Sequence, residues 1–272
     1  MLDTNTTEPQ VRPVTDAEVS TFWENGWVKL PSLIDRQSAA KLLARAKSVF
    51  GEDGRLGLEP VADAKPQGYD YRTWFRSHFG ADQLGADVFS VARSRRLGHN
   101  VARLYGRDSC VRVLLNNFQV KLPRDSGVGE ATVFHQDTPG FLYVEGAIIS
   151  IWMAIDEVTA DMGGLQFRTG AHKLGYLGTM QGWEERLNAF PLTPPMILQP
   201  GDATAHIGNM YHGTGPNMTD RPRWSWTSIM APGDARYTGA KSPYGDNLGL
   251  EPGQILDHPS APIIYAPGNL QT

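Results

Sequence analysis

The chain has 272 residues, of which 40% are hydrophobic, and a formal net charge of −4. This length suits one large globular domain, and the lack of a basic excess argues against nucleic acid as a partner. The single cysteine, Cys110, excludes an internal disulfide and a thiolate metal cluster. No apolar run approaches the roughly 20 residues of a membrane helix, so no membrane partner is expected.

The first ten residues, MLDTNTTEPQ, are polar and have neither a basic start nor an apolar core. They therefore do not resemble a secretory signal, and we expect a cytoplasmic protein with residues 1–12 as a disordered tail. Glycine (29) and proline (19) are plentiful. They favour many turns and argue against a helical bundle.

Helices are expected in the first part of the chain, 13–108. Thr15 and Glu18 have the spacing of a capping box, apolar residues follow at helical spacing, and Gly26 ends the segment. Residues 27–30 indicate a short strand. A second helix is predicted over 35–50, where apolar residues form one stripe.

Residues 51–80 show no clear period and combine aromatic residues with arginines. A long loop of this kind is expected to be a lid over a site, although it could also belong to the core. A third helix is predicted near 82–105, closed by Gly106, with Gly98 as its weak point. The candidate substrate contacts are four residues of the aromatic segment and one further aromatic: Arg72, Trp74, Phe75, Phe79 and Phe134.

From residue 109 onward the pattern becomes that of β-strands. Helices first and strands second do not suit a doubly wound parallel sheet, but they suit a β-sandwich or jelly roll braced by N-terminal helices. We expect one domain with its β core at 109–231 and an irregular segment at 232–272. The clearest strands are predicted at 111–115, 118–120, 147–153 and 224–230.

A candidate metal site begins at Phe134-His135-Gln136-Asp137. On a strand, residues i and i+2 point to the same side, so His135 and Asp137 can face one interior while Gln136 faces away. With one more histidine they would form the facial triad of non-haem iron(II) oxygenases, which leaves open coordination positions. A His-x-Asp pair is also common by chance, as a buried histidine bonded to a carboxylate.

The second half of this constellation is His212, followed by a tight Gly-Thr-Gly-Pro-Asn turn and then by Arg221 and Arg223. The planar fork of an arginine can bind the distal carboxylate of a 2-oxo acid through two charge-assisted bonds. Both arginines have the same strand parity, so the pattern alone leaves both open. His206 lacks the turn and is interpreted as a strand histidine with satisfied hydrogen bonds.

From about Thr15 to about Met230 the chain resembles the phytanoyl-CoA dioxygenase family. The resemblance rests on five segments: GWVKLPSLI, FHQD, ISIWMAID, DMGGLQFRTGAHK and GD…YHGTGPN…R. It implies a mainly β fold, a double-stranded β-helix of the jelly-roll, cupin-like kind. It also implies iron(II), 2-oxoglutarate and dioxygen, and usually the hydroxylation of an unactivated C–H bond.

The resemblance extends to individual positions. It implies that His135, Asp137 and His212 are the catalytic metal ligands, and that Arg223, eleven residues beyond the distal histidine, holds 2-oxoglutarate. The carboxylate Asp137 makes halogenation unlikely to be the outcome, whereas desaturation, epoxidation and rearrangement stay open. The further residues expected in the cosubstrate pocket are Thr214, Trp152, Gln119 and Asn117.

The expected substrate is a small organic molecule, a natural-product intermediate rather than an acyl-CoA. Arg72 and Arg76 beside the aromatic residues suggest an apolar body with an acidic group. The basic stretch from Arg93 to Arg107 could serve a coenzyme A phosphate, but a solvated helix face is the preferred interpretation. A non-catalytic metal-binding or sensor protein and a zinc hydrolase are the rival classes, and neither needs a carboxylate clamp.

Overall fold

The computed structural model describes residues 11–58, 73–178, 184–242, 244–246 and 248–268. The predicted tail at residues 1–10 and the candidate substrate contact Arg72 lie outside these ranges. The described chain starts in ordered structure, because Val11 pairs with Ile34 in a β-bridge. None of the helices in these ranges is long and apolar enough to cross a membrane.

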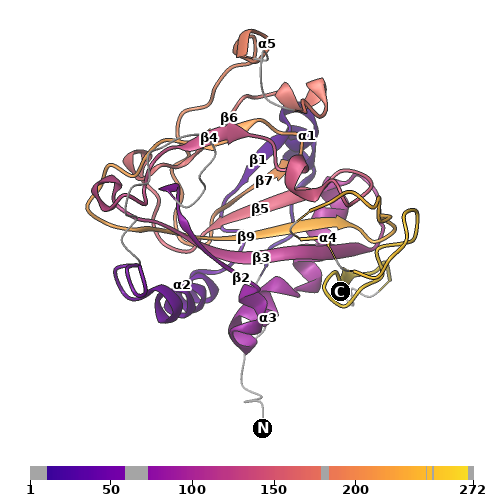
Figure 1. Ribbon diagram of the computed structural model, residues 1–272, viewed down its shortest axis with the longest axis horizontal. Helices are drawn as coiled ribbons and strands as arrows, with labels where there is room; N and C mark the ends of the chain where they lie inside the picture. The colour runs from indigo at the N-terminus through magenta and orange to yellow at the C-terminus, as the bar shows by residue number, and fades with distance from the viewer. Residues whose placement is uncertain (1–10, 59–72, 179–183, 243, 247, 269–272) are drawn as a thin grey trace.

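Two opposed antiparallel sheets form the body of the molecule (Figure 1). The large sheet has the order β1-β7-β5-β9-β3-β10, with β2 also paired to β3, and the small sheet has the order β4-β8-β6. This arrangement confirms the predicted mainly β, jelly-roll fold. The strands of the large sheet are β1 (Trp27–Leu30), β2 (Arg76–Phe79), β3 (Val111–Lys121), β5 (Ile149–Ala154), β7 (Ala203–Ile207), β9 (Arg223–Pro232) and β10 (Ile263–Tyr265). Those of the small sheet are β4 (Thr132–His135), β6 (Leu165–Phe167) and β8 (His212–Thr214).

The central strands are buried on both faces, and their alternation assigns one set of side chains to the core and the other to the site. In β5, Ile149, Ile151 and Met153 join the main hydrophobic core, while Ser150 and Trp152 line a cavity. A strand directs successive side chains to opposite faces, so six consecutive buried residues serve two different environments. The large sheet therefore has a helix-covered face and a cavity-lining face.

The helices before β3 cover the outer face of the large sheet, whereas the short helix α5 lies beyond the small sheet (Figure 1). The Thr15–Glu18 capping box is confirmed, and Gly26 ends the first helix in the left-handed conformation, with φ of 81°. The α-helices are α1 (Asp16–Asn25), α2 (Arg36–Phe50), α3 (Ala86–Ala92), α4 (Arg95–Leu104) and α5 (Glu184–Asn188). Short 3-10 turns lie at Ala81–Gln83, Arg124–Ser126, Thr138–Phe141, Ala160–Met162 and Ala171–Leu174.

The single helix predicted near 82–105 is wrong. The segment divides into a 3-10 turn, α3 and α4, and the break falls at Ser94, whose side chain caps α4 by accepting from the amide of Leu97. Gly98, the predicted weak point, lies inside α4. A Cβ there would come within 2.6 Å of Tyr265, so close packing against β10 requires this glycine.

Two segments predicted to be irregular contribute strands. The aromatic segment 51–80 contains β2, which pairs with the end of β3, and the C-terminal segment 232–272 contains β10, which pairs with its start. Both pairings join residues that are far apart in the sequence, so no local sequence pattern predicts them. They matter because β2 and the C-terminal segment both reach the cavity described next.

Candidate active site

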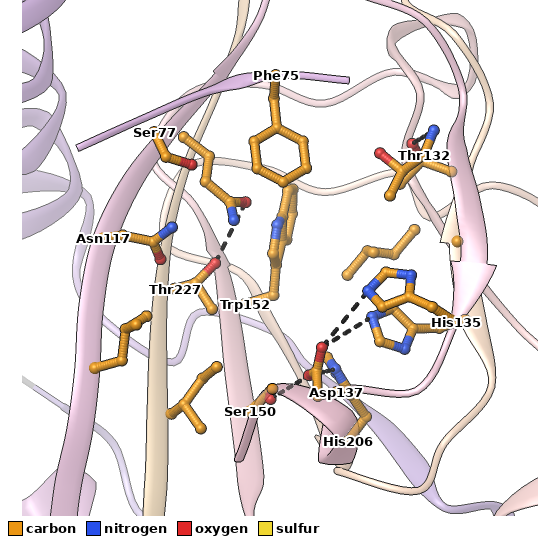
Figure 2. Close-up of a pocket in the computed structure, with 18 of the residues that line it drawn as sticks. Phe75, Ser77, Asn117, Thr132, His135, Asp137, Ser150, Trp152, His206 and Thr227 are labelled. Carbon is orange, nitrogen blue, oxygen red and sulfur yellow. Dashed lines mark hydrogen bonds and ion pairs between the residues drawn. The ribbon is translucent and has the colours of Figure 1, made fainter. Parts of the chain in front are cut away.

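A cavity of about 740 Å³ lies between the large and the small sheet. Figure 2 shows His135, Asp137 and His206 on one side of it, and Ser77, Asn117 and Thr227 across from them. It is lined by side chains from both sheets and from the C-terminal segment, which include Phe75, Phe79, Gln119, Thr132, Ser150, Trp152, His212, Thr214, Arg223 and Tyr244.

His135, Asp137 and His212 converge at one end of this cavity. One ligand atom from each lies within 4.8 Å of the others, a spacing that can hold a metal ion. Nε2 of His135 and Nε2 of His212 lie 3.6 and 3.8 Å from Oδ1 of Asp137. The two histidines sit opposite each other in register across β4 and β8.

The structure corrects the prediction that His135 and Asp137 lie on the same strand. Strand β4 ends at His135, and Asp137 already has helical backbone angles, φ −76° and ψ −30°, at the start of a 3-10 turn. Pro139 and Gly140 follow directly and favour this turn. Asp137 therefore reaches the metal position from a turn, supported by hydrogen bonds from the amides of Asp137 and Thr138 to the carbonyl of Gly208.

Backbone carbonyls orient both histidine ligands. Nδ1 of His135 lies 2.8 Å from the carbonyl of Val133, and Nδ1 of His212 lies 2.9 Å from that of Met210. A carbonyl only accepts, so each Nδ1 carries the proton and each Nε2 keeps its lone pair for a metal. The same hydrogen bonds fix the direction of both rings.

The two oxygens of the Asp137 carboxylate have different neighbours. Its Oδ2 accepts hydrogen bonds from Ser150 (2.5 Å) and from Nε2 of His206 (3.0 Å), which leaves Oδ1 toward the two ligand histidines (Figure 2). His206 is buried and pairs in register with Ser150 across β7 and β5. The sequence interpretation of His206 as a satisfied strand histidine missed this contact, because only strand pairing brings it to Asp137.

The protonation states of the Asp137 carboxylate and the His212 imidazole suit the binding of a metal ion. Burial alone would raise the pKa of Asp137, but the neighbouring imidazoles of His212, His135 and His206 hold it well below its ordinary value. Burial lowers the pKa of His212 to about 3, and the neighbouring His206 and His135 add to this. An ionised carboxylate beside a neutral imidazole is the state that coordinates a divalent cation.

Arg223 occupies the cavity wall next to Trp152. It is only 1% exposed, its guanidinium carbon lies 5.0 Å from the Trp152 ring centre, and Nη1 donates to the carbonyl of Gly163 at 2.6 Å. Its Nε has no hydrogen-bond partner, and burial lowers the pKa of Arg223 to about 9. Arg221, the alternative, is exposed and pairs with Glu157 on the surface. Only Arg223 reaches the cavity.

A second buried cation, Lys121, stands behind Thr214. It is 0% exposed, and its Nζ donates to Thr214 Oγ1 at 2.8 Å, to Thr132 Oγ1 at 3.3 Å and to the carbonyls of Glu130 and Gly215. Burial, with the charge of Arg223, lowers its pKa well below the ordinary value. Neither Lys121 nor Arg223 forms an ion pair with a carboxylate in the described chain. Lys121 shares the strand parity of Asn117 and Gln119 on β3, but it was not among the residues predicted from the sequence.

The remaining candidate residues divide into those that meet the cavity and those that do not. Asn117, Gln119, Thr214, Trp152, Phe75 and Phe79 line it. Phe134 points to the other side of β4, where its ring lies 5.6 Å from that of Tyr211. Trp74 is outside the lining, although its ring centre is 6.2 Å from that of His135. Sequence reasoning missed lining residues from distant segments, among them Ser77, Leu115, Phe141, Thr227, Ile229 and Tyr244.

Comparison with known proteins gives matches over most of the chain. The family model described as phytanoyl-CoA dioxygenase (PhyH) matches residues 22–225. The dioxygenase lolE1 of Epichloe uncinata is 28% identical over 223 residues, which cover 78% of this chain and 80% of that protein. The dioxygenase af480 of Aspergillus fumigatus is 23% identical over 208 residues, 72% of this chain and 60% of that protein.

Solved structures share the fold at low sequence identity. The non-heme alpha-ketoglutarate-dependent epimerase SnoN from nogalamycin biosynthesis superposes with a TM-score of 0.76 and 22% identity, covering 94% of this chain and 98% of that one. The carbocyclase SnoK from the same biosynthesis has a TM-score of 0.72 and 21% identity, covering 92% and 96% of the two chains. These likenesses establish a common jelly-roll architecture.

Proposed function

The chain belongs to the phytanoyl-CoA dioxygenase family, and we propose that it is an iron(II)- and 2-oxoglutarate-dependent oxygenase. One observation carries the proposal: a His-Asp-His cluster and a buried arginine without a carboxylate partner face the same cavity. With iron(II) and 2-oxoglutarate bound, such a site oxidises a substrate C–H bond while 2-oxoglutarate and dioxygen become succinate and carbon dioxide.

The donor set fits iron(II). Two imidazole nitrogens and one carboxylate oxygen within 4.8 Å can occupy one face of the ion and leave the opposite face for other ligands. His135 and His212 would bind through Nε2, and Asp137 through Oδ1. The bonds from Ser150 and His206 to Oδ2 hold this carboxylate in place and keep it from swinging into the cavity.

The other end of the site fits a dicarboxylate. Arg223 and Lys121 are both buried and have no carboxylate partner among the described residues, so a bound anion would stabilise the charged form of each. Arg223 would hold the distal carboxylate of 2-oxoglutarate, with Thr214 beside it and Trp152 lining the pocket. Lys121 donates to Thr214 and thereby fixes the position of its hydroxyl.

We infer hydroxylation of a small natural-product intermediate as the reaction. Halogenation requires an open coordination position on the metal where the carboxylate of Asp137 would bind, so the presence of Asp137 argues against it. The named epimerase and carbocyclase from nogalamycin biosynthesis support a role in natural-product metabolism, and their names indicate that this fold serves outcomes other than hydroxylation. The product of the reaction therefore depends on how the substrate lies in the cavity.

An acyl-CoA hydroxylase is the second candidate, and the basic stretch from Arg93 to Arg107 is its main support. Three of these arginines form ion pairs with aspartates of the same chain. Arg93 pairs with Asp82, Arg103 with Asp16, and Arg107 with Asp234. These three arginines already have carboxylate partners within the chain, which favours the natural-product interpretation.

The proposed function is tested by succinate formation. Protein loaded with iron(II) without oxygen, then exposed to air with 2-oxoglutarate, is expected to form succinate slowly even without substrate. The Asp137→Ala variant should form none above background, whereas Gln37→Lys, an exposed change on α2, should match the parent protein. Equal succinate formation by Asp137→Ala, or none by correctly metallated parent protein, would overturn the proposal.

A further inference from the structure

The floor of the cavity changes its chemistry along strands β3 and β9. The two strands are antiparallel, and their register places like side chains opposite each other. A charged row lies at one end, a neutral polar row follows, and an apolar row lies beyond it. These rows are Lys121 with Arg223, Asn117 with Thr227, and Leu115 with Ile229, and all except Lys121 line the cavity.

The neutral polar row offers hydrogen bonds that the protein itself does not use. Asn117 is buried, and its Oδ1 has no hydrogen-bond partner in the part of the chain that the structure describes. Gln119 has only a long contact, 3.5 Å, from Thr227 Oγ1 to its Oε1. Figure 2 shows Asn117, Ser77 and Thr227 facing the cavity across from His135 and Asp137. A buried carbonyl oxygen without a donor is costly, so a ligand donor is expected to occupy it.

The apolar end carries a group of three aromatic rings, Phe79, Phe141 and Tyr244, hereafter the aromatic mouth. The rings of Phe141 and Tyr244 are nearly parallel, with centres 5.2 Å apart and an angle of 11° between them. Phe79 approaches Tyr244 at 5.8 Å. Phe79 is 49% exposed and Tyr244 38% exposed, so flat aromatic surface remains uncovered at the cavity rim.

Charge is confined to the metal and dicarboxylate end. Among the described lining residues, Asp137, Arg223 and the three histidines are the only ionisable groups apart from Tyr244. Arg76 lies between the lining residues Phe75 and Ser77 in sequence, yet it points away. Its guanidinium donates to the carbonyls of Gly54 and Leu56 and lies 5.0 Å from the centre of the Phe50 ring. Arg76 therefore offers no partner to the acidic substrate group that Arg72 and Arg76 suggested, and Arg72 lies outside the described residues.

We propose that this cavity, beyond the iron and 2-oxoglutarate positions, takes an uncharged small molecule with a flat ring system. The rings lie at the aromatic mouth, and hydroxyl, carbonyl or amide groups face Asn117, Gln119 and Thr227. Among the described residues lining this part of the cavity, an anionic group would lose its hydration without gaining a cation. This inference rests on the proposed function, since it requires Arg223 to be occupied by 2-oxoglutarate.

Two probes of the same shape test the charge preference. 2-Naphthamide is neutral and can donate and accept hydrogen bonds, whereas 2-naphthoate carries the same rings with a negative charge. Equilibrium dialysis against protein loaded with iron(II) and saturating 2-oxoglutarate, without oxygen, should give a Kd at least tenfold lower for 2-naphthamide. Octanoyl-CoA should not displace it.

Matched variants locate the binding position. Ser77→Lys, on the edge strand β2, should improve 2-naphthoate binding at least tenfold, while the exposed change Gln37→Lys should leave both Kd values unchanged. Tyr244→Ala should weaken both probes by a similar factor, because it removes ring stacking and leaves the charge preference intact.

Three outcomes would overturn the inference: equal or tighter binding of 2-naphthoate, displacement by octanoyl-CoA, or no binding of either naphthalene up to its solubility. Succinate formation is measured on the same preparation. If succinate forms but 2-naphthoate is preferred, the substrate inference alone fails. If no succinate forms, the proposed function itself fails.

Discussion

The two ends of the cavity are built by opposite means. At the dicarboxylate end, Lys121 and Arg223 are buried, and they donate hydrogen bonds to Thr214 and to the carbonyl of Gly163, respectively. At the aromatic mouth, Phe79 and Tyr244 are half exposed and come from an edge strand and a C-terminal loop. The contrast teaches that the part of the site that would bind a constant cosubstrate is rigid and charged, whereas the part that would bind the substrate is neutral and assembled from peripheral segments.

The largest expected effect comes from Arg223→Met. Losing a buried charged hydrogen-bond pair costs about 1.5–3 kcal/mol, so the KM for 2-oxoglutarate should rise roughly 10- to 150-fold. The metal-free variant should melt at the same or a higher temperature than the parent, because an unpaired buried cation is gone. Steady-state kinetics and thermal unfolding measure both. A lower melting temperature with an unchanged KM for 2-oxoglutarate would indicate that Arg223 has only a structural role. The difference between the dicarboxylate end and the aromatic mouth would then not hold.

The next effect concerns the carboxylate that the sheet holds in place. His206→Ala should weaken iron(II) affinity by about 10- to 100-fold, the usual range for residues that orient a metal ligand. His206→Gln, which can still donate to Asp137, should recover part of the loss. Iron titration with a competing chelator gives the affinity. Equal loss in both variants would indicate that the ring is needed for packing rather than for the hydrogen bond.

A smaller effect is expected at the aromatic mouth. Tyr244→Ala removes one stacked ring, worth about 0.5–1.5 kcal/mol, and should weaken 2-naphthamide by about 2- to 12-fold. Iron affinity and the KM for 2-oxoglutarate should stay at the parent values. Any change in those two quantities would show that the mouth and the charged end are not independent.

The smallest effect is a pH dependence at Lys121. Its pKa in the folded protein is lowered by burial and by Arg223, so above that pKa the unfolded chain binds more protons than the folded one. The parent protein should therefore gain stability relative to Lys121→Met as pH rises from its lowered pKa toward 10.5. Urea unfolding of both metal-free proteins at pH 7 and pH 10 measures the difference. A difference independent of pH would contradict the burial of a charged lysine.

The sequence predicted the charged end better than the mouth. His135, Asp137, His212 and Arg223 belong to short motifs, and the structure brings all four to one cavity. Strand parity could not separate Arg221 from Arg223. The structure shows why only Arg223 of the two reaches the cavity: β9 begins at Arg223, opposite Lys121 in the strand register, whereas Arg221 precedes the strand and forms an ion pair with Glu157.

What the sequence did not reveal depends on contacts between distant segments. His206 meets Asp137 only because β7 pairs with β5, and Tyr244 meets Phe141 only because the C-terminal segment folds back over the cavity. The helix break at Ser94 is a local N-cap that the sequence prediction overlooked. At Gly98, by contrast, packing against Tyr265 keeps α4 intact at the residue expected to weaken it, so a tertiary contact overrides local propensity there.

The central claim is that one cavity couples 2-oxoglutarate to dioxygen at the His-Asp-His cluster. Its most direct test supplies dioxygen labelled with heavy oxygen to the iron(II)-loaded protein and analyses the succinate by mass spectrometry. The account predicts one labelled oxygen atom in the succinate from the parent protein and no succinate above background from His135→Ala. Unlabelled succinate from the parent, or labelled succinate at the same rate from His135→Ala, would contradict it.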